Sequence, residues 1–225
     1  MWAGFAVLYA TLAVLNLTLG NGLTWVPVLL LGLAACFVVG GALYLHASRR
    51  GKFVVWDELL AGVPAPGRAL DLGCGRGAVA IMTALRFPAA EVDGIDLWRS
   101  VDQSGNSPAA AAAHVRANGV DDRVAFTTGD MTELPYEDAS FDLVTASLSI
   151  HNIPTRDGRD QTVAEAWRVL RPGGTLVVLD ISKARECAER LRALGAEPTT
   201  PRDVGWRVWW SGPWMATRVV TATRP

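Results

Sequence analysis

A glycine-rich turn after a short apolar segment is the clearest candidate for chemistry in the sequence. Gly73, Gly75 and Gly77 stand at alternate positions and lead from the apolar residues 69–72 into a stretch with helical periodicity. Glycines let the backbone approach a bound molecule, and the N-terminus of the following helix adds N–H groups and positive potential. The spacing differs from the G-x-G-x-x-G of dinucleotide binding, so it argues against NAD.

Three acidic residues stand at or near the ends of successive predicted strands. Asp71 precedes the first glycine by two positions, while Asp96 and Asp130 end the second and third predicted strands. Asp96 is placed to accept hydrogen bonds from two ribose hydroxyls. A helix cap or a turn is the alternative role for any one of these acids. Asp71 and Asp96 together favour a nucleoside-binding site.

The elements that would position these residues alternate between short Val/Ile/Leu runs and longer helical stretches, which is typical of a parallel sheet. Predicted strands cover 69–72, 91–95, 124–128, 141–146 and 174–180; predicted helices cover 53–61, 78–87, 109–118, 160–170 and 183–194. Two aromatic-rich strands, 205–210 and 217–223, would close the chain around a turn at 211–213. The expected fold class is α/β: a doubly wound, mostly parallel Rossmann-like sheet with a C-terminal antiparallel hairpin, preceded by two transmembrane helices.

Taken in order, these motifs resemble those of the class I S-adenosylmethionine-dependent methyltransferases. They are the glycine turn at 70–77, Gly94-Ile95-Asp96, Gly129-Asp130-Met131, Phe141-Asp142-Leu143-Val144 and the stretch 168–174. The resemblance runs from about Phe53 to the C-terminus and leaves the apolar N-terminal segment outside. It implies S-adenosylmethionine as methyl donor and S-adenosylhomocysteine as product. The donor is cationic, which suits a site rich in carboxylates.

The resemblance implies a role for each of these residues. Asp71 would help hold the cofactor's ammonium group, directly or through water, and Asp96 would accept bonds from the ribose hydroxyls. Asp130 would accept from the adenine amino group, with Met131 beside the ring. The predicted cofactor-binding set is Asp71, Gly73, Cys74, Gly75, Gly77, Asp96, Leu97, Trp98, Asn106, Gly129, Asp130, Met131 and Ser147.

The segment from Trp98 to Ser107 departs from the family pattern, in which a helix often begins soon after the ribose-binding acid. It is polar and turn-rich, so a loop over the cofactor end of the sheet is expected. Leu97 or Trp98 would lie against the adenine, and Asn106 or Gln103 could reach cofactor or substrate. A plain connecting loop is the alternative.

His151 is the candidate catalytic residue because it follows the fourth predicted strand, where ligands lie in open α/β folds. It would act as a general base if the acceptor is a hydroxyl or a similar weak acid. The alternative is a histidine that packs or orients the loop. The Asn/Asp-Pro-Pro-Tyr/Phe signature of amide and adenine N-methylating members is absent at 147–154. No metal site is expected, since the three cysteines are widely separated.

The N-terminal segment has a different composition from the rest of the chain, because residues 1–48 contain no Asp, Glu, Lys or Arg. Two apolar stretches, 2–19 and 25–46, flank a turn at Gly20-Asn21-Gly22, and each approaches the roughly 20 residues that a membrane span needs. Arg49, Arg50 and Lys52 follow, which places both termini in the cytoplasm. A cleaved signal peptide and a buried hairpin of a soluble oligomer are the alternatives.

These features predict two domains, a transmembrane hairpin over 1–48 and a methyltransferase domain over 49–225. A net charge of -1 argues against nucleic acid as a partner. The expected function is methylation of a small, apolar acceptor such as a quinone-like or isoprenoid compound at the cytoplasmic leaflet, with the lipid bilayer as a partner. A non-catalytic cofactor-binding or scaffold protein and a protein methyltransferase are the alternatives. The oligomeric state stays open.

Four tryptophans cluster near the C-terminus, at positions 206, 209, 210 and 214. Alternate residues of the predicted hairpin would line a core face. They could instead form the wall of an apolar substrate pocket, or rest on the bilayer beside Arg207 and Arg218.

Overall fold

The computed structural model describes residues 1–19, 25–99, 101 and 105–225. The predicted turn at Gly20-Asn21-Gly22 and the loop residue Gln103 lie outside the described residues. The chain forms two compact units, Met1–Val55 with Val204–Ala216, and Trp56–Asp203 with Thr217–Pro225. A functional domain boundary near residue 48 stays a prediction.

The first unit is built on two apolar helices, α1 (Trp2–Leu19) and α2 (Trp25–His46). They pack along aromatic and small residues: the Phe37 ring lies 5.1 Å from that of Phe5 and 5.6 Å from that of Tyr9. After α2 come a π-helical turn, η1 (Ala47–Gly51), and helix α3 (Lys52–Ala61). By length and composition, α1 and the helix from Trp25 to Ala61 could each cross a membrane.

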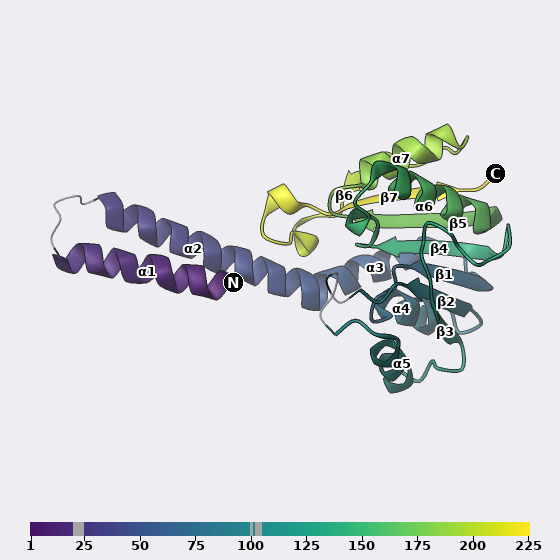
Figure 1. The fold of residues 1–225 in the computed structure, drawn as a ribbon, viewed down its shortest axis with the longest axis horizontal. Coiled ribbons are helices and arrows are strands. Elements are labelled where there is room, and N and C mark those ends of the chain that lie inside the picture. The colour runs from purple at the N-terminus through teal and green to yellow at the C-terminus, as the bar shows by residue number, and fades with distance from the viewer. Residues whose placement is uncertain (20–24, 100, 102–104) are drawn as a thin grey trace. The chain divides into compact units, whose positions relative to one another are not determined.

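The second unit holds a seven-stranded sheet in the order β3-β2-β1-β4-β5-β7-β6 (Figure 1). Its strands are β1 (Arg68–Leu72), β2 (Glu91–Asp96), β3 (Val124–Thr128), β4 (Phe141–Ser147), β5 (Leu170–Asp180), β6 (Arg202–Asp203) and β7 (Arg218–Thr223). Strands β1 to β5 are parallel, whereas β7 runs antiparallel to both β5 and β6. The predicted α/β fold with a mostly parallel sheet and an antiparallel C-terminal pair is confirmed.

Four helices cover this sheet: α4 (Ala78–Arg86), α5 (Pro108–Ala117), α6 (Arg156–Val169) and α7 (Ala184–Ala193). Helices α4 and α5 pack on the half formed by β1 to β3, and α6 and α7 on the half formed by β5 and β7 (Figure 1). Helix α6 begins four residues before the predicted start at 160, because the Thr155 hydroxyl caps it by accepting the Gly158 N–H.

The strand predicted over 205–210 is wrong. The residues that pair with β7 are Arg202 and Asp203, while Trp206–Val208 form a 3-10 turn (η3) and Pro213–Met215 another (η4). Gly205 has φ 90°, a left-handed conformation that interrupts an extended strand. The aromatic residues therefore lie in the connection between β6 and β7 and outside the sheet.

The sheet order creates a switch point between β1 and β4. From β1 the chain moves outward through β2 to β3, then returns to β4 on the other side of β1 and continues to β5. Loops at the carboxyl ends of β1 and β4 diverge there, which is where open α/β sheets bind ligands. The predicted site residues after β1, β2, β3 and β4 consequently lie along one edge of the sheet.

Candidate functional site at the carboxyl edge of the sheet

The glycine turn connects β1 to α4 in a backbone conformation that requires glycine. Gly73, Gly75 and Gly77 have φ of 64°, 52° and 79°. A side chain at Gly73 would overlap Ser149 and lie 3.0 Å from the Met131 terminal carbon. The Gly73 N–H donates to the Ile95 carbonyl at 2.8 Å, so the turn is fastened to β2. The result is a rigid, open backbone at the centre of the edge.

Asp71 lies beneath this turn rather than on its surface. The residue is 2% exposed, and its carboxylate accepts the Thr145 hydroxyl at 2.8 Å and the Ala80 N–H in the first turn of α4. Burial raises the pKa of Asp71 to about 7, and the nearby Asp96 carboxylate adds to the shift. The carboxylate thus joins β1, β4 and α4, and its proton occupancy changes near neutral pH.

Asp96 ends β2 with its carboxylate held by three N–H donors. Oδ2 accepts from the Gly75 N–H at 2.8 Å, and Oδ1 accepts from the Trp98 N–H at 2.6 Å and the Asn106 amide at 3.2 Å. These contacts bring the glycine turn and the loop after β2 to one carboxylate. The structure therefore brings the glycine turn, Asp96 and Asn106 together, and their contact with cofactor stays a prediction.

Asn106 carries a buried acceptor that the described residues do not satisfy. The residue is 9% exposed, and its Oδ1 has no hydrogen-bond partner within 1–19, 25–99, 101 and 105–225. A carboxylate can accept about four hydrogen bonds, of which Asp96 uses three. One accepting position on Asp96 and the Oδ1 of Asn106 remain unused among the described residues. Two such acceptors on contacting side chains match the vicinal diol of a ribose, so the residues present fit a nucleoside cofactor.

Several other predicted cofactor residues have protein partners. The Trp98 indole N–H donates to the Thr128 hydroxyl at 2.8 Å, and Asp130 Oδ1 accepts both the backbone and hydroxyl groups of Thr132 at 2.8 Å. The Ser147 hydroxyl accepts the indole N–H of the buried Trp56 at 2.8 Å.

The remaining members of the predicted set flank the glycine turn and the adjoining loops. Leu97 is exposed, Met131 packs against the core, and Gly129 follows β3. Burial raises the pKa of the Cys74 thiol well above its usual range, so this side chain is neutral. Their contact with cofactor stays a prediction.

The turn after β4 lies at the same carboxyl edge of the sheet, next to the glycine turn after β1. Leu148 adopts φ 55°, a conformation that non-glycine residues rarely take, and its N–H donates to the Leu179 carbonyl at 2.8 Å. The Ser149 hydroxyl donates to the Leu72 carbonyl at 2.8 Å. The turn is therefore tied to both neighbouring strands, and the strain at Leu148 is the kind that functional sites retain.

His151 pairs with Asp180 at the end of β5. Asp180 Oδ2 accepts the His151 backbone N–H at 3.2 Å and lies 3.0 Å from Nδ1 of the ring. Burial by itself would raise the pKa of Asp180, but His151 and the Ser182 and Lys183 N–H groups outweigh it and hold that pKa below its usual value. An ionised carboxylate only accepts, so Nδ1 is the donor to Asp180, and in the neutral ring Nε2 is left as an acceptor.

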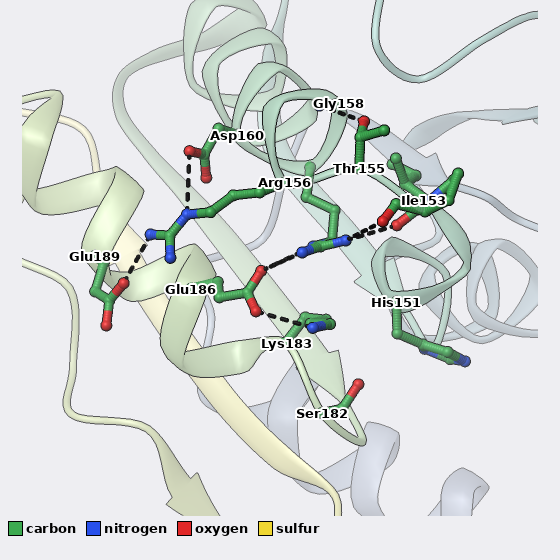
Figure 2. Close-up of polar contacts among 12 residues, drawn as sticks. His151, Ile153, Thr155, Arg156, Gly158, Asp160, Ser182, Lys183, Glu186 and Glu189 are labelled. Carbon is green, nitrogen blue, oxygen red and sulfur yellow. Dashed lines mark hydrogen bonds and ion pairs between the residues drawn. The ribbon is translucent and has the colours of Figure 1, made fainter.

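The loop beyond His151 is fixed by a buried arginine. Arg159 donates to the Ile153 and Pro154 carbonyls at 2.8 and 3.1 Å, and its other side pairs with Glu186 at 2.8 Å. Figure 2 shows Glu186 also bound to Lys183. A hollow of about 180 Å³ opens beside Asp180, between α7 and β7.

Sequence reasoning missed Asp180 and Arg159. Asp180 could have been found from its position, since it ends the fifth predicted strand just as Asp96 ends the second. Arg159 gave no such signal, because it lies just before the predicted helix and its partners are 5 to 27 residues away.

A sheet of this order, with a glycine turn after β1 and an acid ending β2, defines a nucleoside-binding methyltransferase fold. Residues 69–174 match the family described as "Methyltransferase domain". Residues 69–174 therefore form a methyltransferase domain, in agreement with the resemblance to the class I S-adenosylmethionine-dependent methyltransferases, whose cofactor is S-adenosylmethionine.

Curated relatives support this assignment. The chain is 39% identical over 147 residues to the 27-O-demethylrifamycin SV methyltransferase of Amycolatopsis mediterranei, covering 62% of this chain and 50% of the relative. It is 39% identical over 136 residues to the ubiquinone/menaquinone biosynthesis C-methyltransferase of Dinoroseobacter shibae, covering 59% and 51%. The chain thus spans about half the length of these relatives.

Solved structures share the fold. The cyclase SpnF superposes with a TM-score of 0.60 at 26% identity, covering 75% of this chain and 80% of SpnF. A geranyl diphosphate methyltransferase, solved with its diphosphate substrate and sinefungin, gives a TM-score of 0.59 at 20% identity, covering 79% and 78%.

Proposed function

We propose that this protein is a membrane-anchored methyltransferase that moves a methyl group from S-adenosylmethionine to a small, apolar acceptor at the cytoplasmic leaflet. The observation that carries the proposal is the combination of the glycine turn, Asp96 and Asn106 at the carboxyl edge of the sheet with two helices that carry no charge. S-adenosylmethionine supplies an electrophilic methyl group when bound. The chain's own residues then bind the ribose through Asp96 and Asn106, and position the acceptor.

Membrane anchoring is supported by the surfaces of α1 and α2. Only 11% and 17% of the residues in their most apolar windows are buried, so most of these side chains face outward. A hairpin packed in the core of a soluble protein would show the opposite pattern. Arg49 and Arg50 are exposed directly after α2, which supports a cytoplasmic position for the catalytic domain. The charge-free hairpin therefore favours an acceptor that is itself concentrated in the bilayer.

His151 is the proposed general base. Its Nδ1–H is engaged by Asp180, so the accepting Nε2 is available for a proton from the acceptor, and the charge that forms is stabilised by Asp180. The ring is 21% exposed, which leaves it accessible from the loop side. Asp180 acts here as a positioning residue that selects the tautomer.

The test uses the full chain in lipid nanodiscs, with S-adenosylmethionine carrying an isotopic label in its methyl group and a bacterial membrane lipid extract as acceptor source. We expect label in the fraction soluble in organic solvent. Asp96→Ala should greatly reduce that label at limiting cofactor, and Asp121→Ala, which changes an exposed turn carboxylate, serves as the matched control.

The location of the label distinguishes the alternatives. Label in protein would favour a protein methyltransferase. Retained cofactor binding without transfer to lipid or protein would favour the non-catalytic cofactor-binding alternative. The curated relatives named above carry small-molecule methyltransferase names, which is consistent with the first outcome.

A further inference from the structure

We propose that residues 204–216, the tryptophan-rich connection between β6 and β7, form a second membrane contact that inserts into the interfacial layer of the leaflet reached by the polar end of α2. The proposal rests on the proposed membrane hairpin. Its partner is the headgroup and acyl-chain boundary of a lipid bilayer.

The segment packs along the last turns of α2 within the first unit (Figure 1). The Trp206 ring stacks on His46 at 4.8 Å, and the Trp210 ring meets Tyr44 edge-on at 5.9 Å. A side chain added at Gly51 would overlap the Arg207 carbonyl. Glycine at this position therefore permits the close approach of the segment to the helix.

The segment runs along α2 from its polar end toward its apolar part. Arg207 lies at Gly51, beyond the apolar part of the helix, whereas a side chain added at Gly40 would lie 3.4 Å from the Ser211 carbonyl oxygen. Gly40 precedes His46 by six residues, which is about 9 Å along a helix. The interfacial region of one leaflet is about 5–8 Å thick. The segment thus runs from the charged end of α2, across the thickness of the interfacial region, to the outer turns of its apolar span.

The start of α1 marks the same level independently. The Trp2 ring lies against Gly40, 3.0 Å from a side chain added there. The start of α1 and the turn at Ser211 therefore both contact α2 near Gly40. Trp2 at Gly40 and Trp210 at Tyr44 are separated by four residues of α2, about 6 Å along the helix, so both lie within the last two turns of its apolar span. Tryptophan and tyrosine favour this depth because one part of the ring system is apolar and the other polar.

The tip of the segment presents apolar side chains to the outside. Trp214 is 77% exposed and Trp206 is 55% exposed, although both belong to a defined turn. The Trp214 indole N–H donates to the Ser211 hydroxyl at 3.1 Å, and Gly212 leaves room for its ring to cross the turn. A folded turn that exposes a large apolar ring with its N–H already paired is suited to the lipid boundary.

The experiment measures the depth of nitroxide spin labels in the full chain in nanodiscs, from collisions with oxygen, which partitions into lipid, and with an aqueous nickel chelate. Native Cys36, exposed in α2, reports on the hairpin. In a Cys36→Ala background, Trp214→Cys and Trp206→Cys report on the segment, and Leu85→Cys on the exposed surface of α4 gives the aqueous reference. Cys74 and Cys187 are buried and stay unlabelled.

We expect several-fold fewer nickel collisions at 214 than at 85, with position 206 between them. Aqueous values at 214 with lipid values at Cys36 would overturn this inference and leave the hairpin in place. Aqueous values at Cys36 would overturn the membrane hairpin itself. Spin–spin broadening at 214 that disappears on dilution with unlabelled chain would assign the surface to a second copy instead.

Discussion

Asp71 and Asp96 are carboxylates at the ends of neighbouring strands, yet their surroundings give them different properties. Asp96 is partly exposed and has three N–H donors, so it is organised to accept further bonds. Asp71 is enclosed beneath the glycine turn, where burial disfavours its charged form. We therefore propose that Asp96 binds the ligand and that Asp71 shapes the glycine turn beside it.

We expect Asp96→Ala to weaken S-adenosylmethionine binding by about 1–3 kcal/mol, because charge-assisted hydrogen bonds to the ribose are lost. Isothermal titration calorimetry on the detergent-solubilised full chain measures the change. Asp121→Ala should bind like the wild type. Equal affinity in Asp96→Ala and wild type would remove Asp96 from the binding site.

Asp71 should make the stability of the cofactor-free protein depend on pH. Its pKa is about 7 in the folded state and near 3.8 when unfolded, so the folded state binds the proton more tightly. The stabilisation is present below about pH 4 and is lost as the pH rises through about 7. Asp71→Asn lacks this dependence, so the wild-type melting temperature should fall relative to that of the variant between about pH 5 and 8.

Parallel melting curves of the two proteins across this range provide the measurement. The difference between them isolates residue 71 from other titrating groups. A difference that stays constant with pH would show that Asp71 is ionised throughout.

At the scale of elements, the turn after β4 and the end of β5 act together. Leu148 and Ser149 tie the turn to β5 and β1, Asp180 holds His151, and Arg159 fastens the following loop to α7. His151 consequently projects from a rigid support even though it belongs to a loop. Such support is what keeps a catalytic group in a productive orientation.

His151→Ala should lower turnover about 10²–10⁴-fold when the accepting atom must lose a proton. Cofactor affinity should stay close to that of the wild type, since Asp96 ends β2 and Asn106 lies in the loop between β2 and α5. Single-turnover kinetics with the true acceptor and calorimetry with S-adenosylmethionine separate the two effects. Full turnover in the variant would reduce His151 to a packing residue and leave positioning as the source of catalysis.

At the scale of the whole molecule, the chain joins two parts of different composition, an apolar pair of helices and an α/β domain. The positive residues after α2 and the even number of proposed spans predict that both termini face the cytoplasm.

Reporter fusions after Pro225 and before Met1 should therefore read the same side of the membrane. In a matched variant, Arg49, Arg50 and Lys52 are all replaced by Gln. A smaller fraction of this variant should have both termini in the cytoplasm, because the positive residues that keep the end of α2 on that side are lost. Opposite sides for the two fusions in the wild type would indicate a single span.

The amino-acid sequence by itself determined the elements and their class. Strand β3 has the predicted bounds and β1, β2 and β4 differ from theirs by one residue, because short Val/Ile/Leu runs bounded by glycines leave few other structures. The glycine turn and Asp96 are identifiable for the same reason: their roles depend on local backbone geometry and on position at a strand end.

Only the tertiary structure decided which distant groups meet. Asp180 reaches His151 across 29 positions and Asn106 reaches Asp96 around a loop, so neither contact is encoded in local periodicity. The segment 204–216 is the clearest example. Its aromatic-rich composition predicts a strand over 205–210, but Gly205 interrupts the extended chain and the aromatic residues pack against α2 instead. Local propensity is weak beside contacts with neighbours that only the folded chain brings together, here the stacking of Trp206 on His46 and the edge-on contact of Trp210 with Tyr44.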